Sequence, residues 1–424
     1  MLLIGYAYAH WSVQALGIRR QLVLHGCVLV ASAFAIPLAL PELSPLSSSP
    51  VLSIAGTLAV TIGLPFILLA ANSSLVQRWY SVAGLGDPFH LYATSNAGSL
   101  LALLGYPLLF EPIFGLTRGW RIWVALYVVF IGGSALCMWM VSRSTRVLEG
   151  ISEEREASNK SGGSIRPTWS QCAGWTFRGA VATSLLLSVT MKITTDIASA
   201  PIFWVIPLSL YLLSFIAAFS PAFRIPRWLV ASFTAVGIAW ALTGFFYAIP
   251  FYLWLNLVVL LSLVFFGCLL CHGDLSESRP SPQFLTHFYL WIALGGTIGG
   301  MLNSLLAPVM FRSVAEYPIT LFFLVFLIHT RGGYRKKFPR ERMRQLSVYL
   351  PPVTVVVVLA VTSVMMIGLR GSETLVPSDR LSGLWNVMPL GLILFGLLLA
   401  RHAGQFEFVV ACLIIYAFTG VQTL

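Results

Sequence analysis

Charged residues are scarce in this sequence. Asp, Glu, Lys and Arg make up 10% of its 424 residues, whereas 58% of the residues are hydrophobic. A soluble domain carries about 25% charged residues, and its surface would not tolerate so apolar a composition. The scarcity therefore excludes an ordinary soluble globular protein. Apolar runs of about 20 residues, the length at which a helix crosses a bilayer, recur from end to end.

Period-two alternation, which outer-membrane strands of about 10 residues would show, is also missing. Runs such as Val353 to Leu369 and Leu384 to Ala400 are continuously apolar and indicate helices. The sequence has no phosphate-binding loop, no Gly-x-Ser-x-Gly elbow and no dinucleotide fingerprint. It therefore predicts no enzyme activity, no catalytic residue, no cofactor and no metal site.

The apolar runs predict an all-α fold, a polytopic transmembrane helix bundle of about 14 helices at one helix per 20 apolar residues. Two polar stretches divide the chain. We expect an N-terminal transmembrane half over 1–142, a cytoplasmic linker over 143–178, a C-terminal transmembrane half over 179–330, a basic cytoplasmic linker over 331–346 and three additional transmembrane helices over 347–424.

The net charge of +11 comes from loops between the predicted spans. One side of the bundle holds most of the 26 Lys and Arg residues, including Arg19, Arg20 and those of both linkers. The opposite side holds Arg118, Arg121, Arg312, Arg370 and Arg380. Short cytoplasmic loops are enriched in Lys and Arg, so both linkers are predicted to be cytoplasmic. The charge is thus a topology signal, and the expected partner is the lipid bilayer and no nucleic acid.

An internal repeat links the two halves. The run Pro88-Phe-His-Leu-Tyr-Ala-Thr-Ser-Asn-Ala-Gly aligns with Leu285-Thr-His-Phe-Tyr-Leu-Trp-Ile-Ala-Leu-Gly, and both runs continue into a segment that contains proline. Two copies that face the same way, one on each side of a cytoplasmic linker, predict a major-facilitator-like arrangement of two parallel halves. Five spans precede the linker, so we expect an even arrangement to need an earlier helix.

Several runs identify a resemblance to a known family. They are Leu3-Ile-Gly-Tyr-Ala-Tyr-Ala-His10, Asp87 to Leu101, Thr194 to Tyr211, Cys271-His-Gly-Asp-Leu275 and Phe288 to Gly296. In this order they resemble the membrane part of the fused major facilitator/spermidine synthase-like proteins, over most of residues 1–330. The resemblance implies a membrane module.

The chain departs from that family at both ends. Family members usually begin with an earlier helix and a Gln-Pro segment, whereas Met1 opens directly into half a span with no signal-peptide pattern. Many members continue into a soluble aminopropyltransferase-like domain, whereas this chain continues into three more spans. The enzymatic half of the family is therefore not carried over to this chain.

Three residues, Lys192, Thr195 and Asp196, interrupt an apolar region that resumes at Ile202. An ionisable residue at membrane depth costs at least about 2.5 kcal/mol, so it usually faces a cavity or a partner. Lys192 and Asp196 are spaced i, i+4 and can pair on one helix face. Two interpretations stay open. One is a snorkelling Lys beside a loop Asp, and the other is a substrate-binding site formed by all three residues.

Six further residues are candidates for gating or coupling. Glu111 and Glu316 lie near prolines at corresponding places in the two halves, where carboxylates could attract a cation, although loop acids near helix ends are common. His90 and His287 occupy matching positions of the repeat, and helix capping is the alternative to proton coupling. His272 and Asp274 belong to the family motif and are candidate cytoplasmic gate contacts.

Cys268-Leu-Leu-Cys271-His272 also matches the attachment pattern of c-type haem. The motif closes a span on the Arg-rich, cytoplasmic side, whereas haem attachment is expected on the outer face. A structural role is therefore predicted in place of haem binding, metal binding or redox chemistry.

Together these patterns predict an integral membrane carrier-like module of a bacterial cytoplasmic (inner) membrane. Its expected substrate is a small polar or cationic solute, and a polyamine-related solute is suggested by the synthase association of the family. The alternative is a non-transporting scaffold or accessory subunit, with partners in a larger membrane complex or in a separate aminopropyltransferase-like enzyme.

Overall fold

The computed structural model describes residues 1–37, 50–143, 166–196, 200–222, 225–247, 253–311 and 314–329. All regular structure within these ranges is helical. Most of the first linker, the basic linker and the three predicted C-terminal spans lie outside the described residues.

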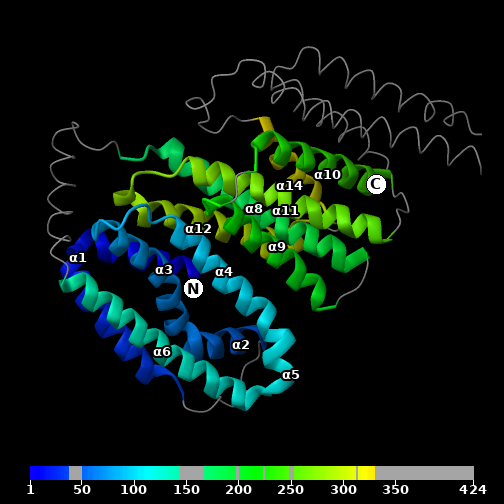
Figure 1. The fold of residues 1–424 in the computed structure, drawn as a ribbon. Coiled ribbons are helices and arrows are strands. Elements are labelled where there is room, and N and C mark those ends of the chain that lie inside the picture. Colours follow the sequence, from blue (N-terminus) through cyan, green and yellow to red (C-terminus); the bar gives the residue numbers. More distant parts are fainter. Residues whose placement is uncertain are drawn as a thin grey trace, which may run out of the picture. The chain divides into compact units, whose positions relative to one another are not determined.

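The helices follow one another along the chain as shown in Figure 1. Before the first linker they are α1 (Leu2–Ala35), α2 (Pro50–Leu58), η1 (Ala59–Gly63), α3 (Leu64–Val82), α4 (His90–Gly105), η2 (Tyr106–Phe110), α5 (Glu111–Ile113) and α6 (Leu116–Arg143). After it they are α8 (Trp169–Asp196), α9 (Ile202–Phe219), α10 (Arg227–Tyr247), α11 (Leu253–Glu277), η3 (Pro282–Phe284), α12 (Leu285–Met301), η4 (Leu302–Leu306), α13 (Ala307–Met310) and α14 (Glu316–His329).

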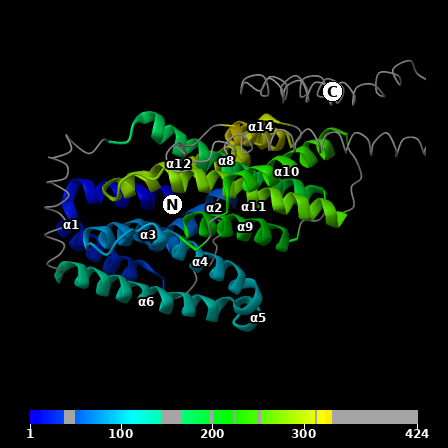
Figure 2. The same ribbon diagram turned by 45° about the horizontal axis from the view of Figure 1, so that its top comes forward.

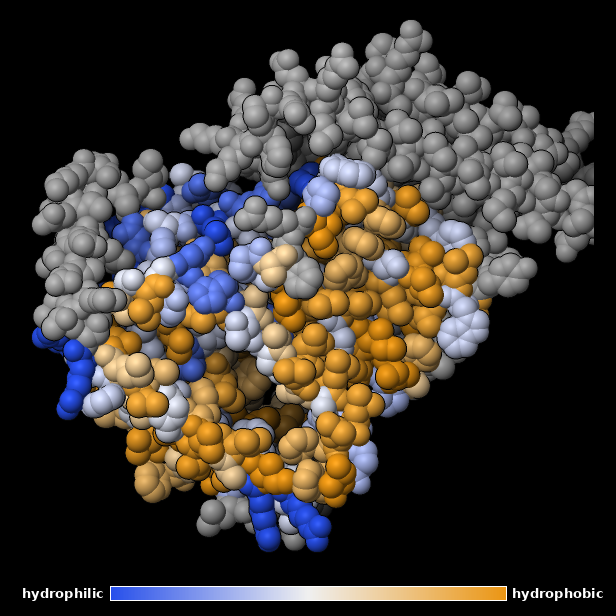
Figure 3. All heavy atoms as spheres, viewed as in Figure 1, coloured by the Kyte–Doolittle hydropathy of each residue, from blue (hydrophilic) through white to orange (hydrophobic). Residues whose placement is uncertain are grey.

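Six helical segments of the described chain are long and apolar enough to cross a membrane. They are Leu2–Ala35, Ser53–Val82, Leu116–Arg143, Ile202–Phe219, Leu253–Glu277 and Pro282–Met310. Hydrophobic residues cover much of the coloured face in Figure 3. A lipid environment removes the cost of this exposure, and helices satisfy their backbone polar groups internally. The chain is therefore an all-α membrane protein with several spans.

Helix α1 consists of two helical arms and is not one continuous helix. Gly17 interrupts it with φ 67° and ψ 168°, a conformation that is essentially confined to glycine. The two arms diverge from this point, in dark blue in Figure 1, and Tyr8 on one arm contacts His25 on the other. Arg19 and Arg20 follow the turn directly.

The described residues group into two compact units. Unit 1 comprises Met1–Ala180, Phe219–Pro221 and Arg279–Thr297, and unit 2 comprises Val181–Ala218, Ala222–Ser278 and Ile298–Leu424. Helices α8 and α12 therefore contribute residues to both units. In unit 1, both arms of α1 pack on α3 through a core that includes Ala9, Leu22 and Leu75. In unit 2, α10 and α11 run side by side, as Figures 1 and 2 both show.

The internal repeat has a structural counterpart in the helices that contain it. Helix α4 widens into the π turn η2 and continues as α5, and α12 widens into the π turn η4 and continues as α13. Counted from His90 and His287, the two π turns begin within one residue of each other. A π turn is rare and often lies at a functional position, so its occurrence in both copies supports the sequence alignment.

Candidate functional site

The ion pair expected at the end of α8 forms on the surface of unit 2. Lys192 Nζ lies 2.9 Å from Asp196 Oδ2, and the two side chains are 23% and 39% exposed. Thr195 is exposed, whereas Thr194 is buried and donates to the main-chain oxygens of Thr190 and Met191. The pair is a local contact within one helix. These contacts do not bring Thr195 and Lys192 around a shared buried site.

His272 lies fully buried in unit 2 within an aromatic environment. Its ring stacks on Phe215 at 3.5 Å and meets Tyr211 edge-on at 5.1 Å. Ser214 Oγ donates to the Tyr211 carbonyl at 2.6 Å and lies 2.9 Å from His272 Nδ1, so Nδ1 carries the proton and donates to Oγ. His272 Nε2 is buried and has no hydrogen-bond partner among the described residues.

Asp274 is a structural anchor at the same end of α11. Its carboxylate accepts from Arg227 Nε at 3.0 Å and from Nη2 at 3.3 Å, a bidentate pair in which Asp274 is 2% exposed and Arg227 25%. Arg227 also donates to the main-chain oxygens of Leu327 and Ile328, at the C-terminal end of α14. One guanidinium thus joins α10, α11 and α14 within unit 2. His272 and Asp274 belong to two separate networks.

In unit 1, a surface ion pair joins the turn before α4 to the segment after α11. Arg279 Nη2 lies 3.1 Å from Asp87 Oδ2, and the Arg279 guanidinium lies over the Phe89 ring at 4.8 Å. The side chains of Arg279 and Asp87 are 38% and 57% exposed. His90 Nδ1 donates to the Asp87 carbonyl at 2.7 Å and so helps to fix this turn. This contact does not cap α4, whose first free N–H groups have no side-chain acceptor among the described residues, so capping and proton coupling by His90 both stay predictions.

Three tyrosines form a buried aromatic cluster in unit 1, with Tyr289 in contact with both Tyr6 and Tyr92. Tyr92 and Tyr289 stack with centroids 4.6 Å apart, and Tyr6 lies 6.3 Å from Tyr289. Tyr289 Oη donates to Gln77 Oε1 at 2.7 Å, and Gln77 Nε2 donates to the Ser73 carbonyl. All three tyrosines are buried. This buried cluster connects α1, α3, α4 and α12 within unit 1.

His287 pairs with a histidine from α1. Its ring centroid lies 5.1 Å from that of His10, and His10 Nδ1 lies 3.2 Å from Thr286 Oγ1. Trp291 Nε1 donates to His287 Nε2 at 2.8 Å, so the other ring nitrogen carries the proton. His90 and His287, equivalent in the repeat, therefore have different partners.

Glu111 and Glu316 each begin a helix, and each belongs to a different unit. Glu111 is exposed at the first residue of α5, directly after the π turn η2. Glu316 is half-buried at the first residue of α14, and its carbonyl accepts from Thr320 Oγ1 at 2.8 Å. A carboxylate in the first turn stabilises a helix dipole, which explains the position of Glu316 without a ligand. Glu111 lies near the C-terminal end of the continuous helix α4–η2–α5, so the same explanation does not apply to it.

A polar cluster on the two arms of α1 was not predicted from the sequence. Gln21 is fully buried, Trp79 Nε1 donates to its Oε1 at 2.9 Å, and its Nε2 has no partner among the described residues. One turn further, His25 lies between Tyr8, at 3.3 Å, and the edge of Trp79. The i, i+4 spacing of Gln21 and His25 within an apolar span was the available signal.

The described chain contains no group of three or more His, Cys, Asp or Glu side chains placed to hold a metal ion. Its polar groups instead form small networks within unit 1 and within unit 2. No family model, no curated protein and no solved structure matches this chain.

Proposed function

We propose that the chain is a carrier-like module of a bacterial cytoplasmic membrane that moves a small polar or cationic solute. In this proposal two parallel repeats of the major-facilitator type are related by a pseudo-two-fold axis along the membrane normal, and about 14 helices include the three C-terminal spans. The chain itself carries out no catalysis.

The stacking of Tyr92 on Tyr289 carries the proposal. These residues are equivalent in the repeat, since each lies two positions after its histidine, and their rings stack at 4.6 Å. Where a two-fold axis relates two copies, equivalent residues near the axis contact each other. The contact supports an arrangement in which the cytoplasmic starts of α4 and α12 meet at that axis.

The surrounding contacts support a closed cytoplasmic end. The Asp87–Arg279 pair and the Tyr289–Gln77 hydrogen bond both join residues that precede the first linker to residues that follow it. An exposed ion pair contributes only about 0 to 1 kcal/mol, so such a contact can open and close during a transport cycle. Alternating access requires contacts of this kind at each end in turn.

A reversible cross-link across this end tests the carrier. In a variant whose native cysteines are replaced by alanine, Asp87→Cys and Arg279→Cys are joined by a reducible cross-linker in proteoliposomes. We expect counterflow of radiolabelled putrescine to fall to background and to recover after reduction, because the cytoplasmic end must open. Each single cysteine variant treated in the same way is the control, and undiminished counterflow in the cross-linked protein would sink the proposal.

The amine class is the first to test because of the family resemblance. Counterflow of putrescine or spermidine above that of empty liposomes would support it. A protein that exchanges neither of them, although it is folded and correctly oriented, would contradict this choice of solute.

A specific observation favours the scaffold as the second candidate. Lys192, His272 and Asp274 all have partners within their own unit, and the Arg227–Asp274 network ties three helices together. Residues with partners of this kind maintain packing. Native mass spectrometry of the complex extracted in mild detergent tests the idea, since a scaffold is expected to retain stoichiometric protein subunits.

A further inference from the structure

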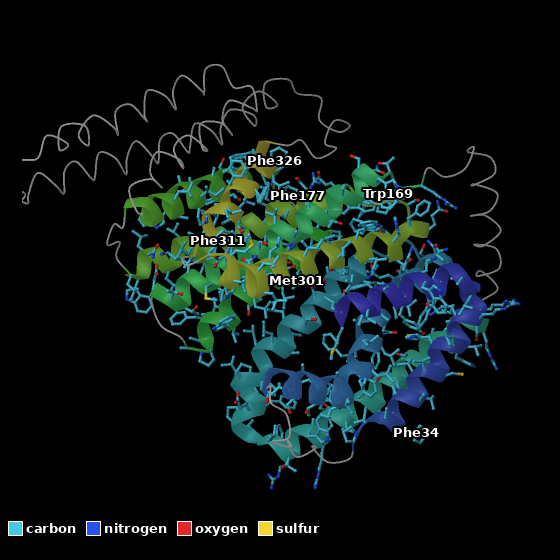
Figure 4. The ribbon with its side chains drawn as sticks, turned by 180° about the vertical axis from the view of Figure 1, so that it is seen from behind. Phe34, Trp169, Phe177, Met301, Phe311 and Phe326 are labelled. Carbon is cyan, nitrogen blue, oxygen red and sulfur yellow. The ribbon has the colours of Figure 1, made fainter. Side chains whose placement is uncertain are left out.

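Helix α12 departs from α-helical geometry where it passes Asn303. In the π turn η4 the Ala307 N–H donates to the Leu302 carbonyl, five residues earlier. The next donor in that register would belong to residue 308, which is proline and has no N–H. The main-chain oxygen of Asn303 therefore lacks the helical donor that this register would supply. Met301, the last residue of α12 before the turn, is labelled in Figure 4.

The Asn303 side chain adds a second unused oxygen. Its Nδ2 donates to Ser184 Oγ at 2.9 Å and to the Gly299 carbonyl at 2.8 Å. A carbonyl only accepts, so the nitrogen must face it, and this fixes the orientation of the amide. Oδ1 consequently points elsewhere. It is buried, and it has no hydrogen-bond partner among the described residues, in a side chain whose residue is only 8% exposed.

Ser184 supplies a third acceptor on the neighbouring helix. Ser184 is 8% exposed and lies on α8. Both Ser184 and Asn303 belong to unit 2. A hydroxyl oxygen has two lone pairs, and Asn303 Nδ2 occupies one of them. Both hydrogens of Asn303 Nδ2 are used by Ser184 and Gly299, so the amide has no free N–H donor, and the Ser184 hydroxyl keeps one O–H of its own. In a membrane span an unsatisfied polar atom of this kind costs several kcal/mol.

We propose that these three oxygens, Asn303 Oδ1, the Asn303 carbonyl and Ser184 Oγ, bind a primary ammonium group. A primary ammonium has three N–H donors and no acceptor, which matches two carbonyl oxygens and a hydroxyl oxygen with one lone pair still open. The proposal deepens the carrier function by assigning the solute's headgroup to α8 and η4, and it rests on that function for the solute's access. An alkali ion or an ordered water would use the same oxygens, and the experiment separates them.

The site belongs to one repeat only. Counted from His90 and His287, the residue equivalent to Asn303 is Tyr106, which is 56% exposed in η2. Asn96, the other asparagine of the repeat helices, donates to the Tyr92 carbonyl of its own helix at 2.8 Å. Asn96 therefore provides a matched control on a helix of the same kind.

Equilibrium binding of radiolabelled putrescine to the full chain in nanodiscs tests the site. We expect Asn303→Leu to weaken putrescine binding by about 10-fold or more, the loss that follows removal of a hydrogen bond to a charged group. Asn96→Leu is expected to change it less than about twofold. Equal weakening by both variants, or none by Asn303→Leu, overturns the proposal.

Competitors identify the occupant. Methylammonium is expected to displace putrescine, whereas tetramethylammonium, which has the same charge and no N–H donor, is expected to leave it bound. Displacement by Na⁺ at millimolar concentration, without displacement by methylammonium, would assign an alkali-ion site and overturn the ammonium proposal. No Asn303-dependent binding of any of these cations would leave an ordered water as the occupant and also overturn it.

A second variant and the counterflow assay separate a loss of binding from a loss of folding or of transport. If Asn303→Leu does not fold, Ser184→Ala decides, since it removes one acceptor and leaves the Asn303 amide bonded to Gly299. We expect at least about threefold weaker putrescine binding, and unchanged binding contradicts the site. Asn303-dependent binding without counterflow would reject the carrier and keep the site, whereas counterflow that is insensitive to Asn303→Leu would keep the carrier and reject the site.

Discussion

At Gly295, α12 and α8 approach so closely within unit 1 that no side chain fits between them. A Cβ atom added there would overlap the main-chain oxygen of Thr176, and one added at Gly179 would lie 2.8 Å from the Ile292 oxygen. Thr176 Oγ1 donates to the Trp291 carbonyl at 3.2 Å across the same contact. Small residues permit such backbone contact in membranes, where van der Waals packing drives helix association.

The substitution Gly295→Ala is therefore expected to destabilise the protein by about 1 to 3 kcal/mol, because the backbone must shift to admit the methyl group. The measurement is the free energy of unfolding in mixed detergent micelles. Gly300→Ala on the same helix is the control, because a Cβ there meets nothing within 4 Å. Equal effects of the two substitutions would show that the close contact is not the cause.

His272 and Asp274 each form polar contacts with a residue of another helix. The sequence marked His272 and Asp274 together because both belong to the motif that carries the family resemblance. Alternate positions on a helix face different directions, however, so one side chain meets Ser214 and the other meets Arg227. Sequence spacing predicted the importance of these residues and could not predict their partners, which come from other helices.

At the scale of elements, Arg227 joins the start of α10 to the C-terminal ends of α11 and α14 within unit 2. It pairs with Asp274 on α11 and bonds to the last carbonyls of α14, where a cation also offsets the helix dipole. The sequence treated Arg227 as one of many cytoplasmic arginines. Its role depends on contacts with residues 47 and 101 positions away.

Removal of this side chain by Arg227→Ala is expected to cost about 2 to 3 kcal/mol, since the almost buried Asp274 loses its counterion and one quarter of Arg227 is already exposed to solvent. Lys192→Ala, which breaks an exposed i, i+4 pair, is expected to cost less than about 1 kcal/mol. Thermal unfolding of the purified variants measures both. A loss in Lys192→Ala as large as that in Arg227→Ala would argue against the assigned anchor.

Helix α1 shows where an element could be predicted. Hydropathy placed two spans before residue 37, and Arg19 and Arg20 marked their turn. The sharpness of the turn depends on the Gly17 conformation, and the contact of Tyr8 with His25 depends on how the two arms pack. The hydrophobic pattern of a sequence predicts which residues are buried and does not predict which of them contact each other.

At the scale of the whole molecule, the charge distribution predicts a definite topology. Leu85, in the turn before α4, is 54% exposed on the Arg-rich side, and Ile113, after η2, is 62% exposed at the opposite end of that helix. One span separates the two positions, so they are expected on opposite sides of the membrane.

A labelling experiment tests this orientation. In a variant without native cysteines, a membrane-impermeant maleimide added to intact cells is expected to modify Ile113→Cys and to spare Leu85→Cys. Permeabilised cells provide the control, because both positions should then react. Labelling of Leu85→Cys alone in intact cells would reverse the topology and place the Asp87–Arg279 pair on the outer side.

By itself the sequence determined the class of protein, an all-helical chain with several apolar segments long enough to cross a membrane. The expected count of about 14 helices was too high for the described residues, in which six such segments are found, and the orientation stays a prediction. Composition, hydropathy and charge are sums over neighbouring residues, so they are readable without a fold. Only the tertiary structure decided that Tyr92 stacks on Tyr289, that Gln21 and His25 share a buried cluster, and that Asn303 donates to Ser184 and leaves its side-chain oxygen without a partner among the described residues. These contacts join residues far apart in the chain. An apolar sequence allows many pairings of its helices, and the packing of the helices selects among them. Local sequence patterns do not report that packing.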